Sequence, residues 1–310
     1  MLAIVAPGQG SQKPGLLSAW LELDGVADEV ALASAATELD LVALGTVADA
    51  ATITDTAVAQ PLLVTTGLVA GRQLLADGLV PDLFAGHSMG ELTVAGLAGI
   101  VDDEPVVSAA AHRGRIMAQA AAQAETGMMA VVGGEADAVV AAIEAAGTEV
   151  STRNGPGQIV AGGLKERLAE LPDLLPAGSK GKSLAVAGAF HTSFMRSVIP
   201  DWAVRIDQLT AAEPSAIVLS NLDGAAVTSG ADLLARMVLQ ITHCVYWDRC
   251  LETMAELGVT GILELPPAGT LTGLARRYLP GAERFNLNTP DQLDEAREFC
   301  RQHSSGAPGR

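Results

Sequence analysis

Basic residues are scarce in this sequence. Lysine and arginine together number 19, against 36 aspartates and glutamates, and the formal net charge is −17. Proteins that bind nucleic acids need clustered lysine and arginine side chains to contact the phosphate backbone. The charge balance therefore argues against a nucleic-acid partner and leaves small molecules and other proteins as candidates.

Cysteines and long apolar stretches are also scarce. The three cysteines, Cys244, Cys250 and Cys300, are an odd number without a C-x-x-C spacing, which indicates neither a disulfide framework nor a zinc site. Glycine, proline or charged residues interrupt every apolar stretch well before the roughly 18 residues that a membrane span requires. Met1 leads into a short apolar run without a basic segment. We expect a soluble cytoplasmic protein that binds neither a metal nor a membrane.

The order of the predicted elements indicates an α/β fold. Residues 2–6 form an apolar run that ends at Pro7-Gly8, which predicts a buried strand followed by a loop. Apolar spacing predicts a helix over 57–79, and the residues from 81 predict a strand, a sharp turn and a helix over 91–100. Further strands and helices are predicted at 216–219, 232–241, 261–265, 270–278 and 284–287. Such alternation implies a mostly parallel sheet.

Residues 126–187 predict an inserted subdomain. The elements expected there follow the order β-α-β-β-α-β, the ferredoxin-like order, at 128–132, 136–146, 149–152, 158–161, 164–175 and 183–186. The turn cluster Asn154-Gly155-Pro156-Gly157 suits a hairpin between the two middle strands. We therefore predict a catalytic subdomain over 1–125 and 188–303, the ferredoxin-like subdomain over 126–187, and a disordered tail over 304–310.

The segment Gly86-His87-Ser88-Met89-Gly90 matches the G-x-S-x-G pattern of a nucleophile elbow. An apolar strand is predicted before it and a helix after it, which is the context that gives this pattern meaning. The glycines are needed because larger side chains beside the turn would collide with the strand and the helix. Ser88 would then lie at the positive end of the helix, where backbone N–H groups can receive developing negative charge.

A serine hydroxyl needs a base to take its proton, and the chain has five histidines. His191 is favoured because it lies where the inserted block returns to the larger subdomain, and hence beside a cleft. His243 follows a predicted helix and stays an alternative, whereas the side chain of His87 should diverge from Ser88. His112 adjoins an arginine in a helix, and His303 lies at the predicted disordered end. No aspartate occupies an obvious third position, but a backbone carbonyl can also orient an imidazole.

Several segments stand in an order that is specific to one family. They are Pro7-Gly8-Gln9-Gly10-Ser11-Gln12, Gln60-Pro61, Gly86-His87-Ser88-Met89-Gly90-Glu91, Arg113-Gly114, Asn154-Gly155-Pro156-Gly157-Gln158, Phe190-His191 and Leu271-Thr272-Gly273-Leu274. With them the chain resembles, over nearly its whole length, the malonyl-CoA:acyl-carrier-protein transacylase family of bacterial fatty-acid synthesis, which is related to the acyltransferase domains of polyketide synthases.

The resemblance implies a fold, an activity and partners. The fold would be a large α/β-hydrolase-like subdomain with a ferredoxin-like insertion. The activity would be transfer of malonyl from malonyl-CoA to the phosphopantetheine thiol of an acyl-carrier protein, by a ping-pong mechanism through a malonyl-serine. Fatty-acid synthesis, and polyketide synthesis beside it, would be the pathways. We expect a monomer that needs no cofactor, since malonyl-CoA is itself the substrate.

The resemblance also assigns roles to individual residues. Ser88 would be the acylated nucleophile and His191 its general base and acid, with the backbone carbonyl of Gln240 orienting the imidazole. The oxyanion hole would be formed by the amides of Gln9 and Met89. The substrate-binding residues would be Arg113, Phe190, Asn154 and Gln60.

Arg113 matches the family arginine that binds the free carboxylate of malonyl. A planar guanidinium can pair with a carboxylate through two parallel hydrogen bonds, so acetyl-CoA should be strongly disfavoured. Phe190 in Ala189-Phe190-His191 resembles the malonyl-type pattern, because its ring would fill the space that an α-methyl group needs. The chain departs from the family at Pro266-Pro267-Ala268-Gly269 and at His243-Cys244, which concerns the loops around the cleft.

An acidic carrier protein would require a local basic patch on this acidic enzyme. The candidates are two pairs of basic residues, namely Lys180 with Lys182 and Arg276 with Arg277.

The sequence favours three other functions less. A serine thioesterase or esterase would use the same elbow but pass the acyl group to water, and an inactive scaffold for carrier proteins would retain the fold. A dinucleotide-binding protein would need glycine at position 13, where Lys13 stands.

Overall fold

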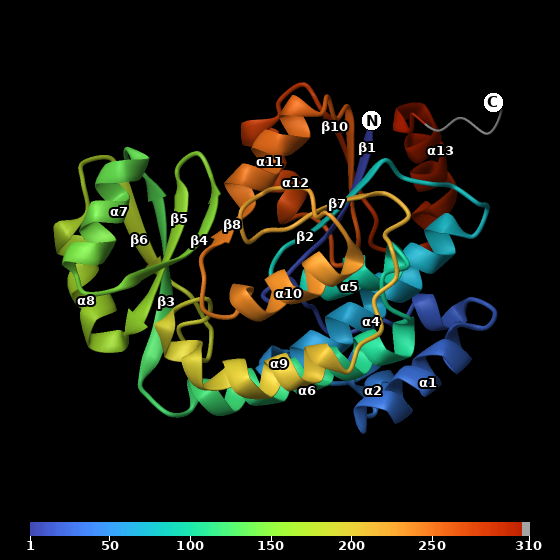
Figure 1. Cartoon of the computed structure of the whole chain (residues 1–310), viewed down its shortest axis with the longest axis horizontal. Coiled ribbons are helices and arrows are strands. Elements are labelled where there is room, and N and C mark those ends of the chain that lie inside the picture. The colour runs from blue at the N-terminus through green and yellow to red at the C-terminus, as the bar shows by residue number, and fades with distance from the viewer. Residues whose placement is uncertain (306–310) are drawn as a thin grey trace.

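A parallel five-stranded sheet forms the larger half of the computed structural model, which describes residues 1–305 (Figure 1). Its strand order is β10-β9-β1-β2-β7, and all four pairings are parallel. The strands are β1 (Leu2–Ala6), β2 (Leu83–Gly86), β7 (Ile217–Leu219), β9 (Gly261–Glu264) and β10 (Glu283–Asn286). The predicted α/β class is therefore confirmed.

The central strand β1 is apolar at every position because helices cover both of its faces. Leu2, Ile4 and Ala6 pack into the larger hydrophobic core, while Ala3 and Val5 pack into a second core with residues of α11 and α12. The alternation follows from the two-residue period of a strand.

Thirteen α-helices surround the sheets in residues 1–305. They are α1 (Val26–Thr37), α2 (Leu41–Thr46), α3 (Ala50–Thr54), α4 (Thr56–Leu75), α5 (Gly90–Leu97), α6 (Asp103–Ala121), α7 (Ala136–Ala145), α8 (Lys165–Leu174), α9 (Ile199–Asp207), α10 (Gly230–Gln240), α11 (Trp247–Glu256), α12 (Leu271–Tyr278) and α13 (Leu293–His303). Three short 3-10 helices complete the set, at Trp20–Glu22, Ser193–Val198 and Pro290–Gln292. None of these helices is apolar over a length that could cross a bilayer.

A second sheet, drawn mainly in green, lies beside the first (Figure 1). Its strand order is β6-β3-β5-β4-β8, and only the β4–β8 pairing is parallel. The strands are β3 (Thr126–Gly133), β4 (Glu149–Gly155), β5 (Gln158–Leu164), β6 (Ser179–Ser183) and β8 (Val245–Tyr246). The short strand β8 comes from outside residues 126–187 and joins this sheet through Thr152 and Arg153.

The last strand of the inserted block was predicted at the wrong residues. The apolar run 183–186 favoured a strand, but β6 covers Ser179–Ser183 and is an exposed edge strand of polar residues and glycine. Its backbone pairs with β3, and pairing at an edge does not require apolar side chains. Leu184 and Val186 instead pack against the larger core, at the side of the cavity described below.

Helix α13 ends at His303, and the two serines after it are held in place. Ser304 Oγ donates to the Val80 carbonyl at 3.0 Å, and the Ser305 amide donates to Asp82 at 3.0 Å. Disorder was predicted for residues 304–310, but these hydrogen bonds hold Ser304 and Ser305. Residues 306–310 lie outside the described part of the chain.

Candidate active site

Ser88 occupies a sharp turn between β2 and α5. Its φ of 54° lies in the left-handed region, which residues with a Cβ seldom adopt. The two glycines of the pentapeptide are required by close backbone approach. A Cβ at Gly86 would lie 2.2 Å from the amide nitrogen of Glu91, and one at Gly90 would lie 2.3 Å from the carbonyl oxygen of Ala6. The turn thus presents Ser88 at the start of α5.

Ser88, His191 and Gln240 lie in hydrogen-bonding contact although 152 positions separate the first from the last. Ser88 Oγ lies 2.7 Å from His191 Nε2, and His191 Nδ1 lies 2.9 Å from the main-chain oxygen of Gln240. Because a carbonyl oxygen can only accept, Nδ1 carries the proton, and the lone pair of Nε2 faces the serine. His191 also has a left-handed backbone, with φ of 59°.

The imidazole of His191 is only 4% exposed. Burial, together with the positive charge of Arg113, lowers the pKa of His191 to about 3. The ring is therefore neutral near pH 7 and able to accept a proton from the serine.

This pKa has a consequence for stability. Below pH 6.5 the unfolded chain binds a proton at this histidine while the folded chain does not, so the folded state loses stability as pH falls towards 3. The variant His191→Gln lacks this titration. We therefore expect its free energy of unfolding, relative to that of the unsubstituted protein, to rise by about 2 kcal/mol when the pH is lowered from 7 to 5. Denaturant unfolding of both proteins at the two pH values measures the difference, and a constant difference would contradict the assignment.

Gln9 and Met89 both border the cavity that Ser88 also lines. Gln9 lies in the loop after β1, where its side chain donates to Thr56 Oγ1 at 3.1 Å. Met89 directly precedes α5. Among residues 1–305, neither backbone amide donates to an acceptor of the protein. Both are thus available to a negatively charged oxygen formed at Ser88.

Arg113 projects from α6 and is 2% exposed. Its Nη1 donates to Gln60 Oε1 at 2.8 Å, and its Nη2 donates to Gln240 Oε1 at 2.9 Å and lies 3.5 Å from Ser88 Oγ. Burial lowers the pKa of Arg113 to about 10, which leaves the guanidinium charged near pH 7. Since both partners are neutral amides, the charge can still bind an anion at the serine.

A cavity of about 400 Å³ lies between the two sheets and contains Ser88, His191 and Arg113. Its wall on the side of the second sheet combines apolar residues with polar ones, namely Met128, Ala130 and Val160 with Thr152, Asn154 and Gln158. A cavity that combines apolar lining residues with a buried guanidinium suits a ligand that carries an anionic group. Within residues 1–305, no cluster of three or more His, Cys, Asp or Glu side chains is placed to hold a metal ion.

The three remaining residues assigned by resemblance, Phe190, Gln60 and Asn154, all border the cavity. Asn154 accepts, through Oδ1, from Nε2 of His87 at 3.0 Å. His87 borders the same cavity as Ser88. His243 and His303 do not border it: His243 is exposed, and His303 ends α13 with its Nδ1 3.0 Å from Thr260 Oγ1.

The four residues considered for carrier docking lie outside the cavity and are exposed. Lys182 pairs with Ala130 and Lys180 with Val132 in the β3–β6 register. Directly paired residues project to the same face of a sheet, so both lysines share the face of Ala130, which borders the cavity. Arg276 and Arg277 lie in the last turn of α12, whose Leu274 borders the cavity as well.

The sequence analysis did not predict that Glu91 is a buried carboxylate beside the active site. This side chain is 1% exposed and accepts from the Asn221 amide and from Gln240 Nε2, each at 2.7 Å. A signal was present, because Glu91 is the one charged residue in the apolar segment 90–100. Nothing in the sequence signalled Asn221.

Comparison with known proteins gives consistent results. The family model described as "Acyl transferase domain" matches residues 4–280. A curated protein from Mycobacterium tuberculosis, named malonyl CoA-acyl carrier protein transacylase, is 44% identical over 298 residues, which cover 95% of this chain and 99% of that protein. The crystal structure of MCAT from Mycobacterium tuberculosis superposes with a TM-score of 0.93 over 96% of this chain and 99% of the other, at 44% identity.

A second solved structure is informative because it contains a partner. It is the structure of a type II polyketide synthase acyl-carrier protein in complex with its malonyl-transacylase. It is 28% identical to this chain, with a TM-score of 0.91 and coverage of 96% and 99%.

Proposed function

This chain belongs to the acyl transferase domain family, and we propose from that premise that it transfers malonyl from malonyl-CoA to the phosphopantetheine thiol of an acyl-carrier protein. The observation that carries the proposal is the convergence of an imidazole and a guanidinium on the oxygen of Ser88. Ser88 Oγ lies 2.7 Å from His191 Nε2 and 3.5 Å from Arg113 Nη2. A nucleophile, its base and a cation for the distal carboxylate would thus meet around one malonyl group.

In the first half-reaction the Ser88 hydroxyl attacks the thioester carbon of malonyl-CoA. His191 Nε2 takes the proton, and the amides of Gln9 and Met89 stabilise the oxyanion, where removal of one donor typically costs about 3 kcal/mol. The C–S bond then breaks, and the protonated imidazole returns its proton to the departing CoA sulfur. The product is malonyl-Ser88 with a neutral His191.

The second half-reaction runs the same steps with the carrier thiol as the nucleophile. His191 takes the thiol proton while the sulfur attacks the ester carbon, and the proton passes to Ser88 Oγ as the C–O bond breaks. Ser88, His191 and the two thiols account for every bond and proton in these steps, which supports a reaction without a cofactor. The enzyme's own groups all come from one chain, which supports action as a monomer. Transfer of this kind supplies fatty-acid synthesis, and polyketide synthesis can draw on it as well.

Two finer assignments belong to the proposal. We assign residues 1–125 and 188–303 to an α/β-hydrolase-like catalytic subdomain and residues 126–187 to a ferredoxin-like one. The parallel sheet and the order of the elements β3 to β6 support this division. Phe190, which borders the cavity and is 7% exposed, would disfavour methylmalonyl by occupying the space of its α-methyl group.

Transfer to a carrier protein distinguishes this function from hydrolysis. Incubation with malonyl-CoA and a phosphopantetheinylated carrier protein should yield malonyl-carrier protein and free CoA. A thioesterase would release malonate and CoA at the same rate with or without the carrier. Mass spectrometry of the carrier protein measures the difference.

The position of the four exposed basic residues makes carrier docking testable. We propose that Lys180, Lys182, Arg276 and Arg277 flank the entrance to the cavity and contact the acidic carrier. Reversal of all four charges should raise the KM for the carrier protein by about 10-fold or more at low salt. Acylation of Ser88 by malonyl-CoA should be unchanged within a factor of about two, and an unaltered KM for the carrier would exclude these residues.

A further inference from the structure

Glu91 is a buried carboxylate three residues after the proposed nucleophile. Its two oxygens each accept one hydrogen bond of 2.7 Å, Oε1 from the backbone N–H of Asn221 and Oε2 from the side-chain amide of Gln240. Burial raises the pKa of Glu91 to about 7, against the opposing charges of Arg113 and Arg236. A group that is so poorly solvated requires both of these donors.

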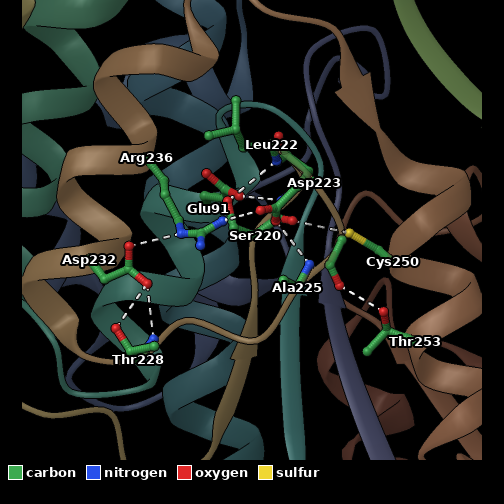
Figure 2. Close-up of polar contacts among 12 residues, drawn as sticks. Glu91, Ser220, Leu222, Asp223, Ala225, Thr228, Asp232, Arg236, Cys250 and Thr253 are labelled. Atoms are coloured by element: carbon green, nitrogen blue, oxygen red, sulfur yellow. Dashed lines mark hydrogen bonds and ion pairs between the residues drawn. The ribbon is translucent and has the colours of Figure 1, made fainter.

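The Asn221 side of this arrangement is held firmly. Figure 2 shows Glu91 beside the segment that follows β7, with Ser220 and Asp223. Arg236 binds the far side of the segment through Asp223 at 2.7 Å, and it also binds Asp232 on its own helix at 2.9 Å. The backbone N–H of Asn221 is therefore a fixed donor aimed at Glu91.

Gln240 connects Glu91 to three parts of the active site. Its amide nitrogen donates to Glu91 and also lies 3.2 Å from the main-chain oxygen of Ser88. Its amide oxygen accepts from Arg113, and its main-chain oxygen accepts from His191. One side chain thus contacts the elbow and the guanidinium, while its backbone contacts the base.

The orientation of the Gln240 amide depends on what faces it. The backbone N–H of Asn221 and the guanidinium of Arg113 can only donate, so Glu91 Oε1 and Gln240 Oε1, which face them, must accept. Gln240 Nε2 then donates to Glu91 Oε2 at 2.7 Å, its shortest contact, and more weakly to Asn221 Oδ1 at 3.1 Å and to the main-chain oxygen of Ser88 at 3.2 Å. A carboxylate at position 91 satisfies this order because it accepts at both oxygens. An amide at position 91 would direct its oxygen to Asn221 and its NH₂ against the NH₂ of Gln240.

We propose that Glu91 is a positioning residue that fixes the amide of Gln240 with its oxygen towards Arg113, and thereby sets the preference for malonyl over acetyl. The inference rests on the proposed malonyl transfer. The inference also distinguishes two possible roles of Glu91, one through its negative charge alone and one through its hydrogen bond to Gln240. If Glu91 acted only as a negative charge near Arg113, its neutralisation would strengthen malonyl binding. If Glu91 acts through Gln240, its replacement by an amide turns Gln240 and weakens malonyl binding.

The test compares Ser88 acylation rates with malonyl-CoA and with acetyl-CoA at limiting concentration. In Glu91→Gln the malonyl-to-acetyl ratio should fall by roughly 10- to 100-fold, as expected for a lost hydrogen bond to a charged group. Glu91→Asp keeps an acceptor at both oxygens and should retain most of the ratio, even if both rates fall.

The matched control is Glu264→Gln. Glu264 is equally buried and accepts from the amides of Gly269, Leu271 and Thr272, each at 2.9 Å, but it does not contact Arg113 or Gln240. This variant should lose stability yet keep the malonyl-to-acetyl ratio within about two-fold. A merely structural effect of a buried amide would change the ratio as much in the control as in Glu91→Gln.

An unchanged or increased ratio in Glu91→Gln would overturn the inference. If that variant does not fold, Glu91→Asp and Gln240→Met carry the test: the ratio should be kept by the first and lost in the second, and any other pattern would contradict the inference. Absence of malonylation in the unsubstituted protein would instead contradict the proposed function itself.

Discussion

Replacing His191 with alanine is expected to slow acylation of Ser88 by malonyl-CoA at least about 10³-fold, within the range for loss of a general base. The imidazole Nε2 is the base in contact with Ser88 Oγ, at 2.7 Å. Without it the hydroxyl proton has no acceptor of suitable pKa, because the nearby guanidinium of Arg113 cannot take a proton. Rapid-quench measurement of the acyl-enzyme gives the rate directly.

The control for this substitution is His243→Ala. His243 is exposed and was the alternative base in the sequence, and its Nδ1 lies 2.6 Å from the Leu239 carbonyl. It should be dispensable, with a rate within about two-fold of the unsubstituted protein. If His243→Ala lost the activity and His191→Ala kept it, the assignment of the base would be wrong.

Replacing Arg113 with alanine is expected to lower kcat/KM for malonyl-CoA by about 10²- to 5 × 10³-fold. Removing one partner of a buried ion pair costs roughly 3–5 kcal/mol, and each factor of ten in rate corresponds to about 1.36 kcal/mol. Acetyl-CoA has no distal carboxylate, so its kcat/KM should fall much less or rise. Steady-state kinetics with both substrates therefore measures a change in preference as well as in rate.

Arg115→Ala is the matched control, since Arg115 lies two positions away on the same helix and is exposed. It should leave both values of kcat/KM within about two-fold. Equal losses for malonyl-CoA and acetyl-CoA in Arg113→Ala would show a structural effect and would remove Arg113 from the recognition of malonyl.

The elbow was predictable from local pattern alone. Gly86 and Gly90 are dictated by contacts within a few residues and by the adjacent strand β1, so a pentapeptide in its strand-helix context contains the necessary information. His191 could be favoured from its place at the return of the inserted block. The part of Gln240 came only from the resemblance, because its main-chain oxygen meets His191 by tertiary packing across 49 positions.

Other features were not accessible from the sequence for physical reasons. Strand β6 is exposed and polar, so its pairing leaves no hydrophobic signal. Strand β8 has two residues and joins a sheet whose other strands all lie within residues 126–183, well before it in the chain. The contacts of Glu91 combine a main-chain donor from one loop with a side chain from α10, and no spacing rule encodes such a meeting.

The central claim is that Ser88 carries the malonyl group between the two thiols. Intact-mass measurement after brief incubation with malonyl-CoA, followed by peptide mapping, tests it most directly. One malonyl group per chain should be found, on the peptide that contains Ser88, and it should disappear on addition of a phosphopantetheinylated carrier protein. An unmodified chain, or a malonyl group that persists in Ser88→Ala, would contradict the claim.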